Sequence, residues 1–172
     1  MKTSRMLVAV TAFVILTAGM SRADTQGKTN ETQKSDKPLQ LAIIPPSLQI
    51  VPEDESISGI RLEIYGRNQN VRGVDIGLMH EAMGDFRGVQ FGVLNLVHGD
   101  HVGLQLAGIY SETKKHISGF QVGMVNHAAS MSGIQIGFVN FADDMTGFQF
   151  GIFNEISSKA TLPVLPLINA KF

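Results

Sequence analysis

The sequence predicts an all-β fold built by repetition, a short-coil β-solenoid of about seven units of 14 to 16 residues. Three observations predict it: a glycine that recurs at a fixed period, a two-residue alternation after each glycine, and glutamine and asparagine at fixed places in the unit. The leading glycines are spaced 14, 15, 15, 16, 14 and 14 residues apart, at Gly59, Gly73, Gly88, Gly103, Gly119, Gly133 and Gly147. A period of this kind means that each unit packs mainly against its neighbours.

We number each unit from its glycine, which is position one. Positions two and four are apolar in all seven copies, and position six is apolar in all but the fourth, where Gly108 stands. A period of two over five residues indicates a β-strand with one buried face. We therefore expect positions two, four and six to point into the core. On that expectation Ile136→Asp, in the sixth copy, costs several kcal/mol because it puts an unpaired charge in a dry interior.

The residues between the apolar positions form a second, polar pattern. Position three is Gln in five copies, position five is Gly in five, and position eight is Asn in four, at Asn95, Asn126, Asn140 and Asn154. This pattern predicts a flat surface that is either a docking site or the packing side of a tight coil. In parallel, in-register coils, equivalent amides stack about 4.8 Å apart and hydrogen-bond along a ladder. We expect Asn126, Asn140 and Asn154 to form one such column.

The second half of the unit has a softer pattern and contains the corner. Ala or Val recurs near position ten, and an apolar residue recurs near position thirteen, at Val71, Val102, Ile117, Met131 and Met145. Extra residues fall here, as in the stretch 112–116, because insertions collect in turns. The methionines are expected to fill the core: Met79, Met83, Met124, Met131 and Met145.

An eight-stranded antiparallel up-and-down β-barrel is the alternative architecture. It would use the seven repeat strands and 164–172, and its best support is the terminal Phe172, because a C-terminal aromatic residue resembles the assembly signal of outer-membrane barrels. However, positions two to six extend only about 17 Å, whereas an outer-membrane barrel needs an apolar band of about 25 Å. The chain also has no Trp and only two Tyr to form aromatic girdles. The solenoid is therefore favoured.

The N-terminal residues predict export. Residues 1–23 have a basic start, an apolar run and a small-residue cleavage site, which is the pattern of a signal peptide. Residues 24–38 contain no aliphatic or aromatic residue before Pro38 and are predicted to be a disordered linker. Residues 39–172 form a single β-repeat domain, with repeats at about 59–156 and caps at 39–51 and 162–172. The expected location is the cell surface, the outer membrane or the periplasm.

Composition excludes two classes of protein. The chain has no cysteine, so it can be neither a disulfide-stabilised scaffold nor a lipoprotein anchored through a lipidated cysteine. Cleavage after residue 23 would remove three of the 14 basic residues and none of the 15 acidic ones, which leaves a formal charge of −4. Since the basic residues are also scattered, nucleic acid is not expected as a partner.

No catalytic, cofactor-binding or metal-binding residue is predicted, and no cofactor is expected. The chain lacks a phosphate loop, a GxSxG elbow, an HExxH motif and a cysteine nucleophile. His98-Gly99-Asp100-His101 offers two imidazoles and a carboxylate, but without an evident fourth zinc ligand we favour a solvated turn. Acidic residues recur in successive turns and are interpreted as keeping the stack soluble: Asp85, Asp100, Glu112, Asp143 and Asp144.

The repeat Gly-x-Gln-x-Gly-x-x-Asn, found at 119–126, 133–140 and 147–154, resembles that of bacterial surface-repeat proteins best known from leptospires. The resemblance covers about 39–172 and implies an exported, surface-type repeat protein with no catalytic residues to carry over. The first two copies depart from the pattern. Arg61 and Asp75 replace Gln, and Gly66 and His80 replace Asn, as expected of terminal capping repeats.

These observations favour an exported, non-enzymatic structural or interaction protein of the bacterial cell envelope or surface. Its expected partner is a protein or glycan of the envelope or surface, and membrane association stays open. One alternative function is that of a small outer-membrane β-barrel acting as a pore or anchor. Another is a secreted β-helix enzyme that acts on polysaccharide through acids such as Asp143 and Asp144.

Overall fold

The computed structural model describes residues 36–172. The predicted signal peptide at 1–23 and most of the predicted linker at 24–38 therefore lie outside the described residues. Lys37 and Pro38, which were assigned to the linker, instead belong to the first strand. All regular elements from 36 to 172 are strands, and this part of the chain contains no helix that is long and apolar enough to cross a membrane.

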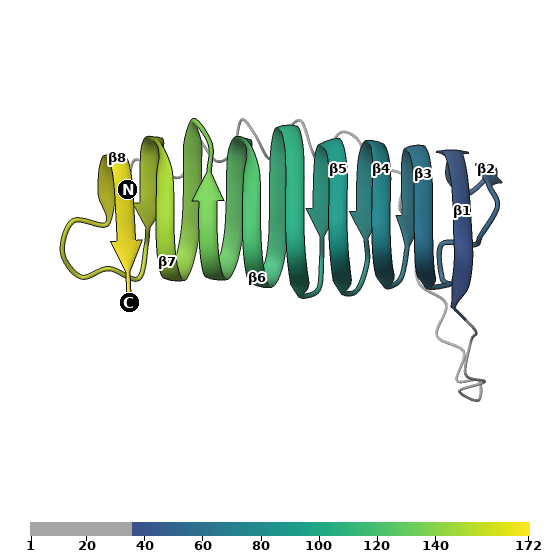
Figure 1. The fold of residues 1–172 in the computed structure, drawn as a ribbon, viewed down its shortest axis with the longest axis horizontal. Coiled ribbons are helices and arrows are strands. Elements are labelled where there is room, and N and C mark those ends of the chain that lie inside the picture. Colours follow the sequence, from purple (N-terminus) through teal and green to yellow (C-terminus); the bar gives the residue numbers. More distant parts are fainter. Residues whose placement is uncertain (1–35) are drawn as a thin grey trace, which may run out of the picture. The chain divides into compact units, whose positions relative to one another are not determined.

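The strands form one sheet that winds as a solenoid (Figure 1). In sheet order after β2 (Leu48–Gln49) come β1 (Lys37–Ile44), β3 (Ile57–Asn68), β4 (Val71–Ala82), β5 (Phe86–Val97), β6 (His101–Ile136), β7 (Val139–Ile156) and β8 (Val164–Lys171). Neighbours from β1 to β7 pair in parallel, and only β2 and β8, at the two ends of the stack, pair antiparallel. The predicted β-solenoid is thus confirmed, and the antiparallel barrel alternative is wrong.

The leading glycines form a column along the stack. Gly59 pairs with Gly73, Gly73 with Gly88, and Gly133 with Gly147, so the coils are in register. Gly133 has a φ of 146°, which an L-residue rarely adopts. A Cβ built on Gly133 would lie 1.9 Å from the carbonyl oxygen of Gly119 in the preceding coil. Position one therefore requires glycine both for its backbone conformation and for close approach between coils.

Gly133→Ala should lower the free energy of unfolding by about 3 kcal/mol or more, because it combines a strained φ with a backbone clash. Gly108→Ala is the matched control, since a Cβ at Gly108 meets nothing closer than 3.7 Å. It should change stability by less than about 1 kcal/mol. Urea unfolding of both variants checks this, and equal effects would contradict the role assigned to the glycine column.

The facing predicted for positions two, four and six is wrong. In the third copy Gln90 is fully buried, whereas Phe91 at position four is 43% exposed. The same inversion holds along the stack: Gln105, Gln121, Gln135 and Gln149 are buried, and Ile136 is 44% exposed. We call the half-buried and exposed side chains at positions two, four and six the outer apolar face: Ile60, Leu62, Ile64, Val74, Ile76, Leu78, Val89, Phe91, Val93, Leu104, Leu106, Phe120, Val122, Met124, Ile134, Ile136, Phe138, Phe148, Phe150 and Ile152.

The interior is filled by columns of inward-facing side chains. Position three supplies Gln, position eight mostly Asn, position ten mostly Ala or Val, and the residue two before each glycine supplies a bulkier side chain. In the column formed two residues before each glycine, the buried residue that precedes Gly103 is His101. Val102, which the sequence pattern favoured, is instead 45% exposed. Met131 and Met145 fill the core as predicted. Met124 is 47% exposed, and Met79 and Met83 are half-buried, so the prediction fails for these three.

The predicted asparagine column is present. Nδ2 of Asn126 donates to Oδ1 of Asn140, and Nδ2 of Asn140 donates to Oδ1 of Asn154, each over 2.8 Å. A parallel glutamine ladder runs with opposite polarity, since Nε2 of Gln149 donates to Gln135 and Nε2 of Gln135 donates to Gln121, each over 2.7 Å. The recurrence of one amide at one position is thus explained by hydrogen bonds along the stack.

The same amides also bond across the interior to backbone carbonyls. Nε2 of Gln135 donates to the carbonyl of Phe141 over 3.1 Å, and Nδ2 of Asn140 donates to the carbonyl of Phe150 over 2.9 Å. Amide side chains can satisfy backbone carbonyls inside a narrow coil, which apolar side chains cannot do. The polar pattern is therefore the packing side of the coil, and the apolar residues at positions two, four and six face outward.

Two adjacent substitutions test this facing. Gln135→Leu should lower the free energy of unfolding by about 2–4 kcal/mol, because buried acceptors on Gln121 and Phe141 lose a donor. Ile136→Asp should change it by only about 0.5–1 kcal/mol, because the side chain already faces outward. Denaturant unfolding at low protein concentration is the measurement, and a larger effect of Ile136→Asp would restore the original facing assignment.

Candidate functional site

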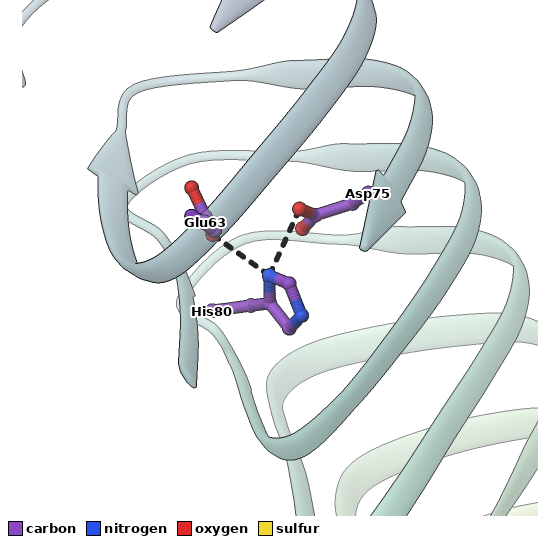
Figure 2. A group of neighbouring side chains, drawn as sticks. All are labelled: Glu63, Asp75 and His80. Atoms are coloured by element: carbon purple, nitrogen blue, oxygen red, sulfur yellow. Dashed lines mark hydrogen bonds and ion pairs between the residues drawn. The ribbon is translucent and has the colours of Figure 1, made fainter. Parts of the chain in front are cut away.

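The residues that depart from the repeat pattern in the first two copies come together as one buried cluster. Arg61 and Glu63 lie on β3, and Asp75 and His80 lie on β4. All four side chains are buried. Figure 2 shows the His80 ring pointing between the carboxyl groups of Glu63 and Asp75. A Cβ built on Gly66 would overlap the carboxyl group of Glu63, so this glycine makes room for the cluster.

The four side chains are joined by ion pairs and hydrogen bonds. Nδ1 of His80 lies 2.7 Å from Oε1 of Glu63 and 2.8 Å from Oδ1 of Asp75. Arg61 holds Asp75 with two parallel bonds, Nε to Oδ1 at 3.0 Å and its terminal nitrogen to Oδ2 at 2.5 Å. Its Nε also lies 3.3 Å from Oε1 of Glu63. A guanidinium group, an imidazole ring and two carboxyl groups thus share one interior site.

These contacts define the protonation state of His80. Nε2 of His80 lies 2.8 Å from the carbonyl oxygen of Phe91, which can only accept, so Nε2 carries a hydrogen. Burial alone would lower the pKa of His80, but its hydrogen bonds to Asp75 and Glu63 outweigh burial and raise it to about 9. His80 is therefore an imidazolium at neutral pH. It also replaces the Asn of position eight, because Asn95 donates in the same way to Leu106.

The two carboxyl groups respond differently to the same surroundings. Burial would raise the pKa of Asp75, but Arg61 and His80 outweigh it and lower this pKa to about 2. Burial raises the pKa of Glu63, and the hydrogen bond from His80 offsets only part of that increase. Asp75 is thus the firmly ionised member of the cluster.

Glu63, Asp75 and His80 are residue types that bind metal ions, and one ligand atom of each lies within 4.8 Å of the other two. The guanidinium group of Arg61, however, already contacts both carboxyl groups as the local cation. His80 also directs a protonated nitrogen between them, and a metal ligand must be deprotonated. The arrangement therefore fits an internal ion-pair cluster better than a metal centre.

The cluster begins the glutamine ladder. Nε2 of Gln90 donates to Oδ2 of Asp75 over 3.0 Å, and Nε2 of Gln105 donates to Gln90 over 3.0 Å. An ionised carboxylate can only accept, so Asp75 makes every later glutamine donate toward the N-terminal end of the stack. The chemistry of the cluster is thus structural: it starts the ladder and sets its polarity.

His80→Asn should lower the free energy of unfolding at pH 7 by about 3 kcal/mol, because it leaves two buried carboxyl groups with one cation. The control replaces the whole cluster with the consensus of the repeat, combining Arg61→Gln, Glu63→Gly, Asp75→Gln and His80→Asn. This quadruple variant should recover most of that loss, because neutral amides can extend the ladder. Additive losses measured by urea unfolding would contradict the assignment.

The pH dependence of the same variants follows from the raised pKa of His80. A raised pKa in the folded state gives stability that is complete below the unfolded value of 6.5 and is lost as the pH rises through about 9. Wild-type stability should therefore fall between pH 6.5 and 9, and this fall should be absent from His80→Asn. Unfolding curves across this range are the measurement, and an identical alkaline decline in the variant would exclude His80 as its source.

The histidine-rich turn at 98–101 does not assemble a site. Nε2 of His98 lies 2.8 Å from Glu81, and Asp100 accepts a hydrogen bond from the backbone of His116. His101 points into the core and stacks on Phe86, with ring centroids 4.9 Å apart. Neither ring nitrogen of His101 has a hydrogen-bond partner among residues 36–172. Burial lowers the pKa of His101 to about 4, so the ring is neutral.

His101 should make the fold sensitive to acid. A pKa lowered from 6.5 to about 4 gives stability that is present above pH 6.5 and lost as the pH falls through 4, up to about 3 kcal/mol in all. His101→Leu should remove this loss and raise stability at pH 7, because an apolar side chain continues the column that contains Ile117. Unfolding free energies between pH 7 and 4 check this, and an unchanged acid decline in the variant would contradict it.

Two of the acidic turn residues accept hydrogen bonds from the backbone of the next coil. Asp85 accepts from the amide of Asp100 over 3.0 Å, and Asp100 accepts from the amide of His116 over 3.1 Å. Asp143 and Asp144 are both exposed and have different neighbours. Asp144 contacts Lys171 and Ser158, and its hydrogen bond from Lys171 leads the effects that lower its pKa to about 2. Asp144 is thus held ionised, which does not suit a general acid.

The outer apolar face is the second candidate site, and sequence reasoning missed it because those residues were placed inside. In its middle lies a shallow hollow of about 430 Å³, lined by apolar residues that include Ile76, Phe91, Leu106 and Val122. The hollow forms beside Gly108, which carries no side chain on this face. An exposed apolar surface that covers all seven repeats is typical of an interaction site.

Comparisons with known proteins found no matching protein-family model, no matching curated protein and no matching solved structure.

Proposed function

We propose that this chain is an exported, non-enzymatic structural or interaction protein of the bacterial cell envelope or surface, and that it acts through the outer apolar face. The observation that carries the proposal is the inverted facing of the strands. Gln and Asn at positions three and eight occupy much of the interior, and apolar side chains at three positions of the repeat are left outside. Such a face is costly to leave in water unless another surface covers it. The resemblance of the repeat to bacterial surface-repeat proteins supports the same role.

The buried cluster supports the non-enzymatic part of the proposal. Its four side chains are enclosed and bonded to one another, so a substrate cannot reach them without unfolding of β3 and β4. The hollow in the outer face has mainly apolar walls, which suit packing against a surface more than acid–base chemistry.

Fractionation of the producing cells tests the proposal. The wild type should be recovered with the envelope, whereas Phe120→Asp combined with Ile136→Asp should be released in soluble form, because charges on the outer face oppose burial. Leu162→Asp, in the exposed loop between β7 and β8, is the control and should behave as the wild type. Equal envelope recovery of all three proteins, each with unchanged thermal unfolding, would refute a role for the face.

A further inference from the structure

We propose that the outer apolar face is the contact between two copies of this chain, which pack face to face about a two-fold axis. This inference rests on the interaction role proposed above and names the partner as a second copy. In the arrangement the two sheet faces lie about 10 Å apart, as in a β-sandwich, and their apolar side chains interdigitate.

The extent of the face suits a stable dimer. The coils lie about 4.8 Å apart, and the apolar stretch of each strand is about 17 Å long. Seven repeats therefore present a flat area of about 500–600 Å². Accessible area exceeds flat area on a corrugated surface, so the face approaches the ~800 Å² that each partner buries in a standard interface. It also reaches the size of the largest apolar patch on a typical monomer, about 300–600 Å².

The shape of the face suits a second copy. The coils lie almost parallel to one another along a straight stack (Figure 1). A sheet of many strands with so little twist is unusual and is generally stabilised by side-chain ladders, such as those inside this stack, or by stacking on another flat surface. A copy of the same face has the same flatness and the same coil spacing, so a two-fold axis matches them along the whole length.

The charge of the chain favours this partner over a lipid surface. Interfacial membrane binding usually combines an apolar face with flanking Lys or Arg. Beside this face, the outward residue before each glycine is basic only at Arg72 and Arg87 and is Ser, Val or Thr in the other copies. Residues 36–172 contain 9 basic and 13 acidic residues, so anionic lipids would repel them.

The hollow gives the dimer a point of contact. A two-fold axis that lies in the interface plane, along the strands of the middle coil, places the coil of Phe120 in one copy opposite the coil of Phe91, beside the hollow, in its mate. Phe120 is 50% exposed and lies in the coil after the middle one. An aromatic side chain that fills an apolar hollow is a frequent anchor of interfaces. Gly108 leaves the hollow open, and a Cβ built there meets no atom closer than 3.7 Å.

The test uses sedimentation velocity of the purified protein over a concentration series. Wild type should dimerise. Phe91→Asp combined with Phe120→Asp, on either side of the middle coil, should weaken the dimer by about 100-fold or more, as should the corresponding pair of lysine substitutions. A mixture of the acidic and basic variants should recover the dimer, because each substituted residue faces the coil that carries the opposite charge on the mate. Gly108→Leu fills the hollow without adding charge and should weaken the dimer about 10-fold.

Three results would overturn the proposal: a wild type that stays monomeric at about 100 μM, a dimer that the acidic pair does not weaken, or a mixture that stays monomeric. Binding of monomeric wild type to phosphatidylcholine vesicles, lost in the acidic pair, would assign the face to lipid. That result would overturn the dimer but leave the proposed interaction role in place. If envelope recovery depends on the face but the purified wild type is monomeric, the dimer is likewise refuted and the proposed interaction role stands.

Discussion

Parallel stacking of coils in register is the constraint on which the rest of this structure depends. From the fifth copy onward it places glutamine over glutamine and asparagine over asparagine, so that a side-chain amide can donate in one direction and accept from the other. It also brings the leading glycines so close that a side chain on one would strike the carbonyl of the one before. Register and composition therefore depend on each other.

The narrow coil explains why the polar side chains are inside. An interior one side chain wide brings the opposite walls of a coil close together, so its side chains lie within reach of backbone carbonyls on both walls. Gln and Asn satisfy these groups, while small residues such as Ala82 and Ala128 leave the necessary space. The apolar residues that alternate with them must then face outward. The outer apolar face is thus a direct consequence of the ladders inside.

The sequence contained enough information to predict the architecture but not the facing. The recurrence of Asn126, Asn140 and Asn154 distinguished parallel coils from antiparallel strands, because only parallel coils give these residues a common partner. Period two, by contrast, identifies two faces without saying which is buried. The usual assumption that apolar residues lie inside gave the wrong answer for Ile136. It holds for wide cores, whereas a coil of about 14 residues has room for only a few side chains.

The buried cluster was also visible in the sequence, as departures from the repeat. Arg61 and Asp75 replace Gln, Glu63 replaces Gly, and His80 replaces Asn. Each departure alone is what a degenerate terminal repeat would show. Their shared site appears only when parallel pairing places Arg61 beside Asp75 and Gly66 beside His80. Departures that are complementary in charge and lie one coil apart are therefore the signal by which such a cluster can be found.

The two ends of the stack close in different ways, and this leaves the sides of the solenoid for contact with other molecules. At the N-terminal end the ladder starts at the charged cluster, and β1 and β2 cover it. At the C-terminal end β8 pairs antiparallel with β7 and carries Pro166, which has no amide hydrogen to offer a further strand. Oε1 of Gln149 ends its ladder without a hydrogen-bond partner among residues 36–172.

Because neither end continues the parallel pairing, extension by further coils is disfavoured, and the broad apolar surface lies on the side of the stack. Within residues 36–172 the broad exposed apolar surface is therefore lateral, and this is the side on which we propose that a partner packs.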